Sequence, residues 1–181
     1  MKNRKSPLYG FVFILAIAAA AILLVKHFHI ADFRVVKPGV LYTSGQPHGM
    51  DYTRMLYRYH LATIVNIRPV SEHREQNWYN EEIIWTKNNG VNYIELPIEK
   101  KKYFPDKETQ DKFLAIMADK NKLPVLLHGG SDDKRVAMLA AVWLEKGQGQ
   151  SVEETTEIIR KIIDDRKLTE AEIEFIRNLA K

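Results

Sequence analysis

The stretch PVLLHGGSDDKRVAMLA, residues 124–140, places a histidine, two glycines, two aspartates and an arginine between two apolar runs. The run Val125–Leu127 predicts a buried strand, and the segment from Arg135 to Lys146 predicts a helix. Glycines between a strand and a helix leave backbone N–H groups that can bind an anion, and the helix dipole favours negative charge there. Arg135 can add a bidentate contact. The predicted phosphate-binding residues are His128, Gly130, Ser131, Asp132, Asp133, Lys134 and Arg135. The alternative is an ordinary glycine turn followed by a solvated arginine.

The two aspartates complicate this prediction. Asp132 and Asp133 place carboxylates where an anion would bind, and a like-charge contact at ~4 Å costs about 4 kcal/mol at a protein-like dielectric. Either aspartate can instead cap the helix that begins near Arg135, because Asp is a preferred N-cap residue. Two interpretations therefore stay open: the loop binds an anion, or the protein fills the site with its own carboxylate.

From about Asp32 onward, short β-rich runs alternate with helical patterns. Strands are predicted in FRVV, VLYTS, ATIVNI, VNYIELPI and PVLLH, and helices over residues 51–59, 75–89, 107–119 and 135–146, with two more capped at Ser151 and Thr169. This alternation predicts an α/β fold, with a mostly parallel sheet and helices on both of its faces. Ligands of such folds bind at the carboxyl ends of the strands, where residues 128–135 lie.

The N-terminal part of the chain differs from the rest. Residues 1–7 form a basic segment, and residues 8–25 carry no charge over about 27 Å of helix. We expect a transmembrane anchor over residues 8–25, a linker over 26–31 and a domain over 32–181; a cleaved signal peptide is the alternative. The N-terminal basic cluster favours a domain on the extracytoplasmic side.

Composition excludes several functions. The net charge is only +4, from 27 basic and 23 acidic residues, and no arginine-rich tract suggests nucleic-acid binding. The chain has no cysteine, which suits an oxidising compartment without structural disulfides. The six histidines show no metal-ligand spacing, so neither a metal nor a cofactor is expected.

Other chemistry-bearing residues have structural interpretations. Arg68 follows a predicted strand and can contact a bound anion, or it can form a structural ion pair. Trp78 and Trp85 lie two helical turns apart, which favours core packing for both. Lys100 to Lys102 can attract anions, but a solvated charge run is the simpler interpretation.

The segment Phe33–Leu179 resembles the bacterial dual-specificity branch of the protein tyrosine phosphatase superfamily. The similarity lies in FRVVKPGVLYTSGQP, LATIVNIRP, VNYIELPI and above all PVLLHGGSDDKR. The phosphate-binding loop of the family consists of His-Cys, five residues and Arg. This sequence keeps the spacing from His128 to Arg135, and Gly129 stands at the position of the cysteine.

The resemblance implies a phosphatase fold without its nucleophile. In the family, the cysteine thiolate attacks phosphorus, the arginine and loop amides hold the oxygens, and an acid protonates the leaving group. Asp132 replaces a usual glycine, and Val136 replaces a usual Ser or Thr. The family spacing before the loop points to Glu99 as the general acid; Asp106, in FPD, is the other candidate. Either can be a surface carboxylate, and Asp106 can be the N-cap of the next helix.

The sequence therefore suggests a membrane-anchored pseudophosphatase that binds a phosphorylated small molecule, lipid or protein without hydrolysing it. One alternative is a phosphomonoester hydrolase whose nucleophile was replaced. Another is a structural interaction module with a vestigial pocket.

Overall fold

The computed structural model describes residues 7–28, 30–131, 133–163 and 167–180, and in the first helix only the side chains of residues 10–21. The centre of the domain is a five-stranded sheet in the order β1-β2-β5-β3-β4. Its strands are β1 (Arg34–Lys37), β2 (Leu41–Ser44), β3 (Thr63–Asn66), β4 (Asn92–Glu95) and β5 (Val125–His128). Strand β1 is antiparallel to β2, and the other neighbours are parallel. The predicted mostly parallel sheet is confirmed.

The helices follow the predicted order with small differences. They are α1 (Pro7–Phe28), α2 (Met50–Tyr59), α3 (Val70–His73), α4 (Asn77–Asn89), α5 (Lys107–Ala118), α6 (Lys134–Val142), α7 (Val152–Ile162) and α8 (Glu170–Leu179). A 3₁₀ turn, Lys120–Lys122, follows α5, and a π-helical turn, Trp143–Gly147, extends α6. The predicted helix over 75–89 begins later, at Asn77, because the chain before it forms the separate short helix α3. Both predicted capping boxes, at Ser151 and Thr169, are confirmed.

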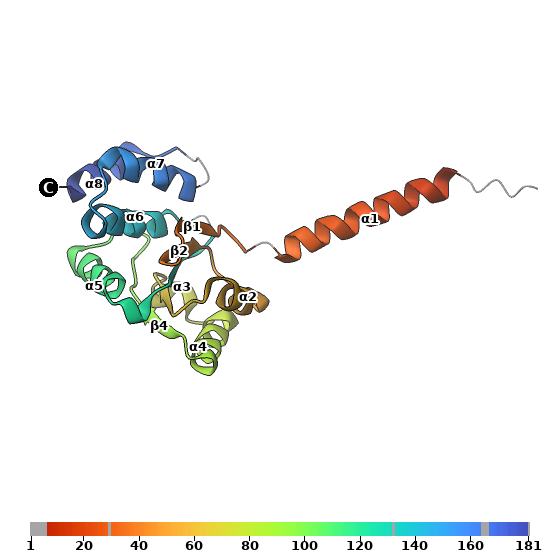
Figure 1. Ribbon diagram of the computed structural model, residues 1–181, viewed down its shortest axis with the longest axis horizontal. Coiled ribbons are helices and arrows are strands. Elements are labelled where there is room, and N and C mark those ends of the chain that lie inside the picture. The colour runs from red at the N-terminus through yellow and green to blue at the C-terminus, as the bar shows by residue number, and fades with distance from the viewer. Residues whose placement is uncertain (1–6, 29, 132, 164–166, 181) are drawn as a thin grey trace, which may run out of the picture.

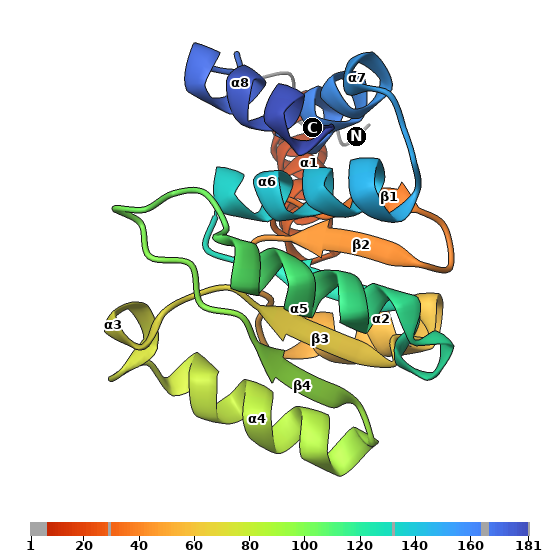
Figure 2. The same cartoon turned by 90° about the vertical axis from the view of Figure 1, so that its left-hand side faces the viewer.

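Helices cover both faces of the sheet, as Figures 1 and 2 show. Successive strand residues point to opposite faces, so neighbours in β5 belong to different cores. Leu127 packs in the core with α5 and α6, whereas Leu126 packs in the core with α2 and α4. Helices α7 and α8 pack on α6. The strands are therefore buried on both sides, which explains why they form continuous apolar runs in the sequence.

The register of the parallel strands aligns their carboxyl ends along one edge of the sheet. His128, the last residue of β5, is paired with Ser44 at the end of β2 and with Asn66 at the end of β3. Asn66 is in turn paired with Glu95 at the end of β4. The carboxyl ends of four strands therefore lie in one row, and the loops that follow them meet there.

Helix α1 extends away from the domain (Figure 1). Its apolar residues Phe11, Phe13 and Ile14 are each more than 60 % exposed. Within the described part of the chain, no helix is long and apolar enough to cross a membrane. The predicted transmembrane anchor over residues 8–25 is therefore not supported, and residues 1–6 of the predicted basic segment lie outside the described residues.

Glu145, in the π-helical turn, is a buried acidic side chain. It is 7 % exposed, and neither carboxylate oxygen has a hydrogen-bond partner among the described residues. Burial raises the pKa of this carboxyl to about 7, although Lys146 opposes the shift, and the nearby Glu153 adds to it. Between the ordinary carboxyl pKa and about pH 7, the folded protein holds a proton that the unfolded chain releases. Stability attributable to Glu145 is therefore present at low pH and lost as the pH rises through this window.

We expect Glu145→Gln to raise the free energy of unfolding at pH 8. The gain at pH 8 should exceed the gain at pH 4.5 by about 1–3 kcal/mol, because glutamine stays neutral at both pH values whereas the buried glutamate is ionised at pH 8. Urea unfolding at the two pH values measures this difference. Glu174→Gln, an exposed substitution on α8, is the control and should show little pH dependence. An equal effect of Glu145→Gln at both pH values would contradict the prediction.

Candidate functional site

Arg135, in the first turn of α6, is only 2 % exposed, and its guanidinium is held by carboxylates of its own chain. Asp133 accepts hydrogen bonds from Arg135 Nε at 2.8 Å and from Arg135 Nη2 at 2.6 Å. Asp133 is also the N-cap of α6, because it accepts from the Arg135 backbone N–H at 3.1 Å. The backbone N–H of Gly130 donates to the same carboxylate at 3.2 Å. The predicted N-cap role is thus confirmed for Asp133, whereas Asp132 lies outside the described residues.

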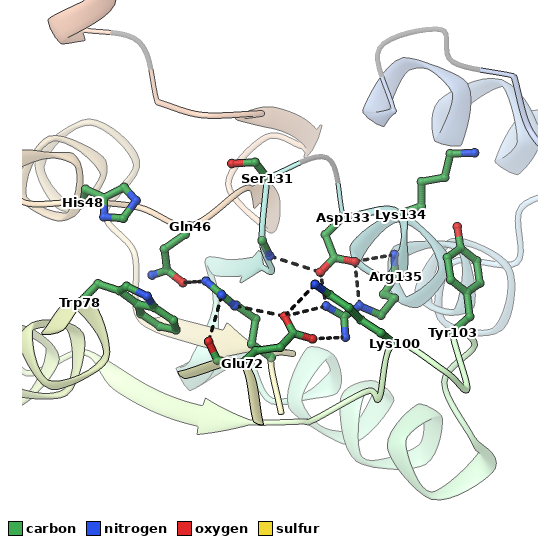
Figure 3. A pocket seen from close by; sticks show the side chains of 12 residues that line it. Gln46, His48, Glu72, Trp78, Lys100, Tyr103, Ser131, Asp133, Lys134 and Arg135 are labelled. Carbon is green, nitrogen blue, oxygen red and sulfur yellow. Dashed lines mark hydrogen bonds and ion pairs between the residues drawn. The ribbon is translucent and has the colours of Figure 1, made fainter. Parts of the chain in front are cut away.

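A second carboxylate reaches Arg135 from the far side of the site (Figure 3). Glu72 on α3 accepts from Arg135 Nη1 at 2.8 Å and from Nη2 at 3.1 Å. The carbonyl oxygen of Ile98 also accepts from Nη1. Burial by itself lowers the pKa of Arg135, but the hydrogen bonds that it donates to Asp133 and Glu72 outweigh it and raise the pKa. The guanidinium is therefore permanently charged and fully paired.

The carboxylate of Asp133 fills the space beside Gly129. A Cβ atom placed on Gly129 would lie 2.6 Å from Asp133 Oδ2 and 2.9 Å from Val136 Cγ2. Real Cβ atoms essentially never come this close to another heavy atom. Glycine at position 129 is thus a steric requirement of this loop as long as Asp133 stays where it is.

This geometry decides what Asp133 can do chemically. A phosphoryl group bound in the loop needs the Gly130 N–H and the Arg135 guanidinium as donors, and Asp133 already accepts from both. A carboxylate that occupies the donors cannot also attack a phosphorus atom held by them. Asp133 therefore takes the place of a bound anion and is not a substitute nucleophile. This is the second of the two interpretations that the sequence left open.

A pocket of about 670 Å³ opens above this ion-pair cluster, at the edge formed by the strand ends. Its lining residues are Gln46, His48, Arg68, Glu72, Trp78, Lys100, Tyr103, Gly130, Ser131, Asp133, Lys134 and Arg135. Most of the predicted loop is thus brought together in one pocket. Lys134 points toward α8 and donates to Glu172 at 3.2 Å and to the carbonyl of Lys167 at 3.1 Å.

Arg68 forms the other wall of the pocket. Its Nη1 donates to Gln46 Oε1 at 3.1 Å, and its Nη2 donates to the carbonyl oxygen of Glu72 at 3.2 Å. The guanidinium lies 4.3 Å from the ring centroid of Trp78. The prediction that Trp78 packs in the core is therefore wrong, because α4 turns this side chain toward the pocket. Trp85 does pack against the core, with its ring 5.4 Å from that of Tyr52.

The two candidate general acids lie elsewhere. Asp106 is exposed and caps α5 by accepting from the Thr109 N–H at 2.9 Å, so the N-cap interpretation is confirmed. This hydrogen bond lowers the pKa of Asp106, which keeps the carboxylate ionised. Glu99 is also exposed, and both acids border a small separate cavity of about 40 Å³. Neither side chain lines the large pocket.

His128 lies beneath the loop and not in the pocket. It is fully buried, and its Nε2 lies 3.0 Å from Oε1 of the equally buried Glu82. The two atoms are within ion-pair distance but are not aligned as a hydrogen bond. Glu82 also contributes, after burial, to raising the pKa of Tyr52 and of Tyr93. The structure therefore assigns His128 to a buried polar cluster that supports the end of β5.

The sequence predicted no role for Glu72, although its carboxylate contacts Arg135 at the centre of the site. Its carboxylate also lies 3.4 Å from Arg68 Nε and 3.9 Å from Lys100 Nζ. The one available signal was the spacing of four between Arg68 and Glu72, which favours an ion pair on a helix. The contact with Arg135 joins residues 63 positions apart, and no local pattern predicts such a contact.

Comparisons with known proteins agree with this fold. No protein-family model and no curated protein sequence matches the chain. Among solved structures, the catalytic core of the PP-IP phosphatase Siw14 from S. cerevisiae has a TM-score of 0.68 at 19 % identity, with 82 % of this chain and 85 % of that chain covered. The active form of Tk-PTP gives 0.65 at 18 % identity, covering 82 % and 96 %. PTPMT1 in complex with PI(5)P gives 0.63 at 16 % identity, covering 82 % and 94 %.

The chain therefore has the fold of the cysteine-based tyrosine and dual-specificity phosphatases, as the sequence resemblance implied. The identities are too low to carry more than the fold. Such folds host many functions, so the function of this chain depends on the residues of its own site.

The position of Asp133 can be tested without any ligand. We expect Gly129→Ala to destabilise the protein by about 1–3 kcal/mol, the usual cost of overpacking, because its Cβ meets the carboxylate. In an Asp133→Ser background the cost should fall by about 1 kcal/mol or more, since serine retains an N-cap oxygen but is shorter. Val136 keeps the remaining cost above zero. Urea unfolding of the four proteins of this cycle measures the coupling.

Gly130→Ala is the matched control, because its Cβ would lie 4.0 Å from Asp133 Oδ2 and meets no clash. Its cost should be the same in both backgrounds. If Gly129→Ala also costs the same in both backgrounds, Asp133 does not occupy this space in solution.

Proposed function

We propose that this protein is a pseudophosphatase, which binds a phosphorylated ligand in the pocket above Arg135 and does not hydrolyse it. The observation that supports the lack of hydrolysis is the position of the Asp133 carboxylate, which occupies the loop donors and leaves no room for a side chain at Gly129 unless it moves. The observation that supports binding is the pocket itself, which Arg68, Lys100 and Arg135 line. The structural neighbours support a phosphorylated ligand. Siw14 is a PP-IP phosphatase, and PTPMT1 was solved in complex with PI(5)P.

The chemistry of the chain supports the proposed absence of hydrolysis. Hydrolysis in the family depends on a thiolate, and the sequence contains no cysteine. Neither Glu99 nor Asp106 lines the pocket, so neither is in reach of a leaving group there. The hydrolase alternative therefore needs a nucleophile other than a cysteine.

Ligand binding requires that a phosphate compete with Asp133. Arg135 would exchange one anion for another, so the net gain from inorganic phosphate alone is small. A larger ligand gains further contacts from Arg68 and from Lys100, whose side chain is 74 % exposed at the pocket rim. A phosphorylated small molecule, a lipid headgroup and a phosphorylated protein all present this chemistry.

The interaction-module alternative is also favoured by a specific observation, namely that Arg135 is fully paired by Asp133 and Glu72. If the carboxylate never leaves, the pocket is vestigial and a protein partner must bind another surface. The two proposals differ in whether the loop keeps its capacity to hold an oxyanion.

We expect Asp133→Ser to bind tungstate and inorganic phosphate at least about tenfold more tightly than the parent chain, because it removes the competing negative charge. Calorimetric titration of the full chain measures this gain. The gain should disappear in Asp133→Ser combined with Arg135→Ala. Asp106→Ser is the control, because it also replaces an N-cap aspartate by serine and changes the net charge by the same amount. It should bind both anions as the parent chain does.

The same proteins are assayed with p-nitrophenyl phosphate, and none should release phosphate. No gain in oxyanion binding on Asp133→Ser would favour the interaction module. Turnover by the parent chain that is lost on Arg135→Ala would instead establish the hydrolase alternative.

A further inference from the structure

The C-terminal helix α8 contributes a buried acidic residue that reaches the wall of the pocket. Glu172 is 2 % exposed, and its carboxylate is shared by two pocket-lining residues. The hydroxyl of Tyr103, in the loop after β4, donates to Oε1. The ammonium of Lys134, at the start of α6, donates to Oε2 at 3.2 Å. One carboxylate thus joins three segments that are far apart in the sequence.

The loop that carries Tyr103 needs such support. Tyr103 has a φ of 62°, in the left-handed region that costs a non-glycine residue roughly 1 kcal/mol or more. The next residue, Phe104, stacks on Phe175 of α8 with ring centroids 4.8 Å apart. Helix α8 therefore holds this loop by an apolar stack and by a hydrogen bond to a charged acceptor, and the hydrogen bond is the directional contact of the two.

Glu172 is held in its ionised form. Burial alone raises the pKa of its carboxyl, but the hydrogen bonds from Tyr103, from the Thr169 N–H and from Lys134 outweigh it and lower the pKa. The Thr169 N–H belongs to the capping box of α8. The same carboxylate therefore caps the start of its own helix and contacts the pocket-lining residues Tyr103 and Lys134.

We propose that Glu172 is a positioning residue, which holds Tyr103 and Lys134 in place and thereby shapes the end of the pocket away from Arg68. The proposal rests on the proposed function, because it places the part of the ligand beyond the phosphate against the pocket wall that Tyr103 forms. In the same proposal, Lys134 pairs with Glu172 and does not bind the ligand. The cations that bind the anion are then Arg135, Arg68 and Lys100. Helix α8 is in this view part of the binding site, although it lines none of the pocket itself.

The position of the loop is tested first, because this test needs no ligand. Trypsin cuts after lysine, and the exposed residues Lys100 to Lys102 lie directly before Tyr103. We expect Glu172→Gln and Tyr103→Phe each to speed tryptic cleavage at these lysines about tenfold, since each weakens the charged hydrogen bond that holds the loop. The double variant should be no faster than either single one. Glu170→Gln, an exposed change in the first turn of the same helix, should cleave at the parent rate.

The effect on the pocket is tested in the Asp133→Ser background, where inorganic phosphate and phenyl phosphate are titrated as probes. Adding Glu172→Gln should weaken phenyl phosphate about fivefold or more and leave inorganic phosphate unchanged, because only the phenyl ring extends to the Tyr103 wall. A general loss of stability would weaken both probes alike, and would overturn the positioning role. Unchanged cleavage at Lys100 to Lys102 would also overturn it. If neither probe binds before Glu172 is changed, the proposed function fails, while the cleavage result still decides whether Glu172 holds the loop.

Discussion

The structure of the site depends on one buried charge, the guanidinium of Arg135. An arginine that is 2 % exposed must be paired, because an uncompensated buried charge costs several kcal/mol. In a phosphatase loop that partner is in part the substrate. Here the chain supplies it through Asp133 and Glu72, each with two oxygens within hydrogen-bonding distance of the guanidinium. The buried arginine is thus satisfied without a ligand.

Three features of the loop follow from the same carboxylate. Asp133 caps α6, neutralises Arg135 and fills the space beside Gly129. Each role by itself is common, but together they make the residues interdependent. A side chain at position 129 requires that Asp133 and Val136 shift, and moving Asp133 removes the hydrogen bonds that it accepts from Arg135 Nε and Nη2. The glycine at position 129 and the internal carboxylate of Asp133 therefore depend on each other.

The pocket around this cluster keeps the shape of an anion site while its charges are redistributed among its own residues. Lys134 is directed to Glu172 on α8, and Arg68 is held by Gln46 and by the backbone of α3. Only Lys100 projects mainly into solvent among these cations. In the proposed function, the ligand gains its affinity from several weak contacts around its phosphate. The tight transition-state binding on which catalysis depends is then not required of the pocket.

The sequence alone determined what local physics controls. Apolar runs and their alternation predicted the sheet and its helices, and capping boxes at Ser151 and Thr169 predicted two helix starts. The residues from His128 to Arg135 indicated the loop, with Asp132 and Asp133 both as candidate caps. Only the tertiary structure decided which contacts close the site. Glu72 and Trp78 line the pocket, and Glu172 contacts two of its lining residues, because strand register and helix packing bring distant segments together. No local pattern encodes such distances. The predicted anchor over residues 8–25 is the other difference, because its apolar run predicted a membrane span that the described residues do not support. Local propensity depends on neighbouring residues, whereas a binding site depends on the path of the whole chain.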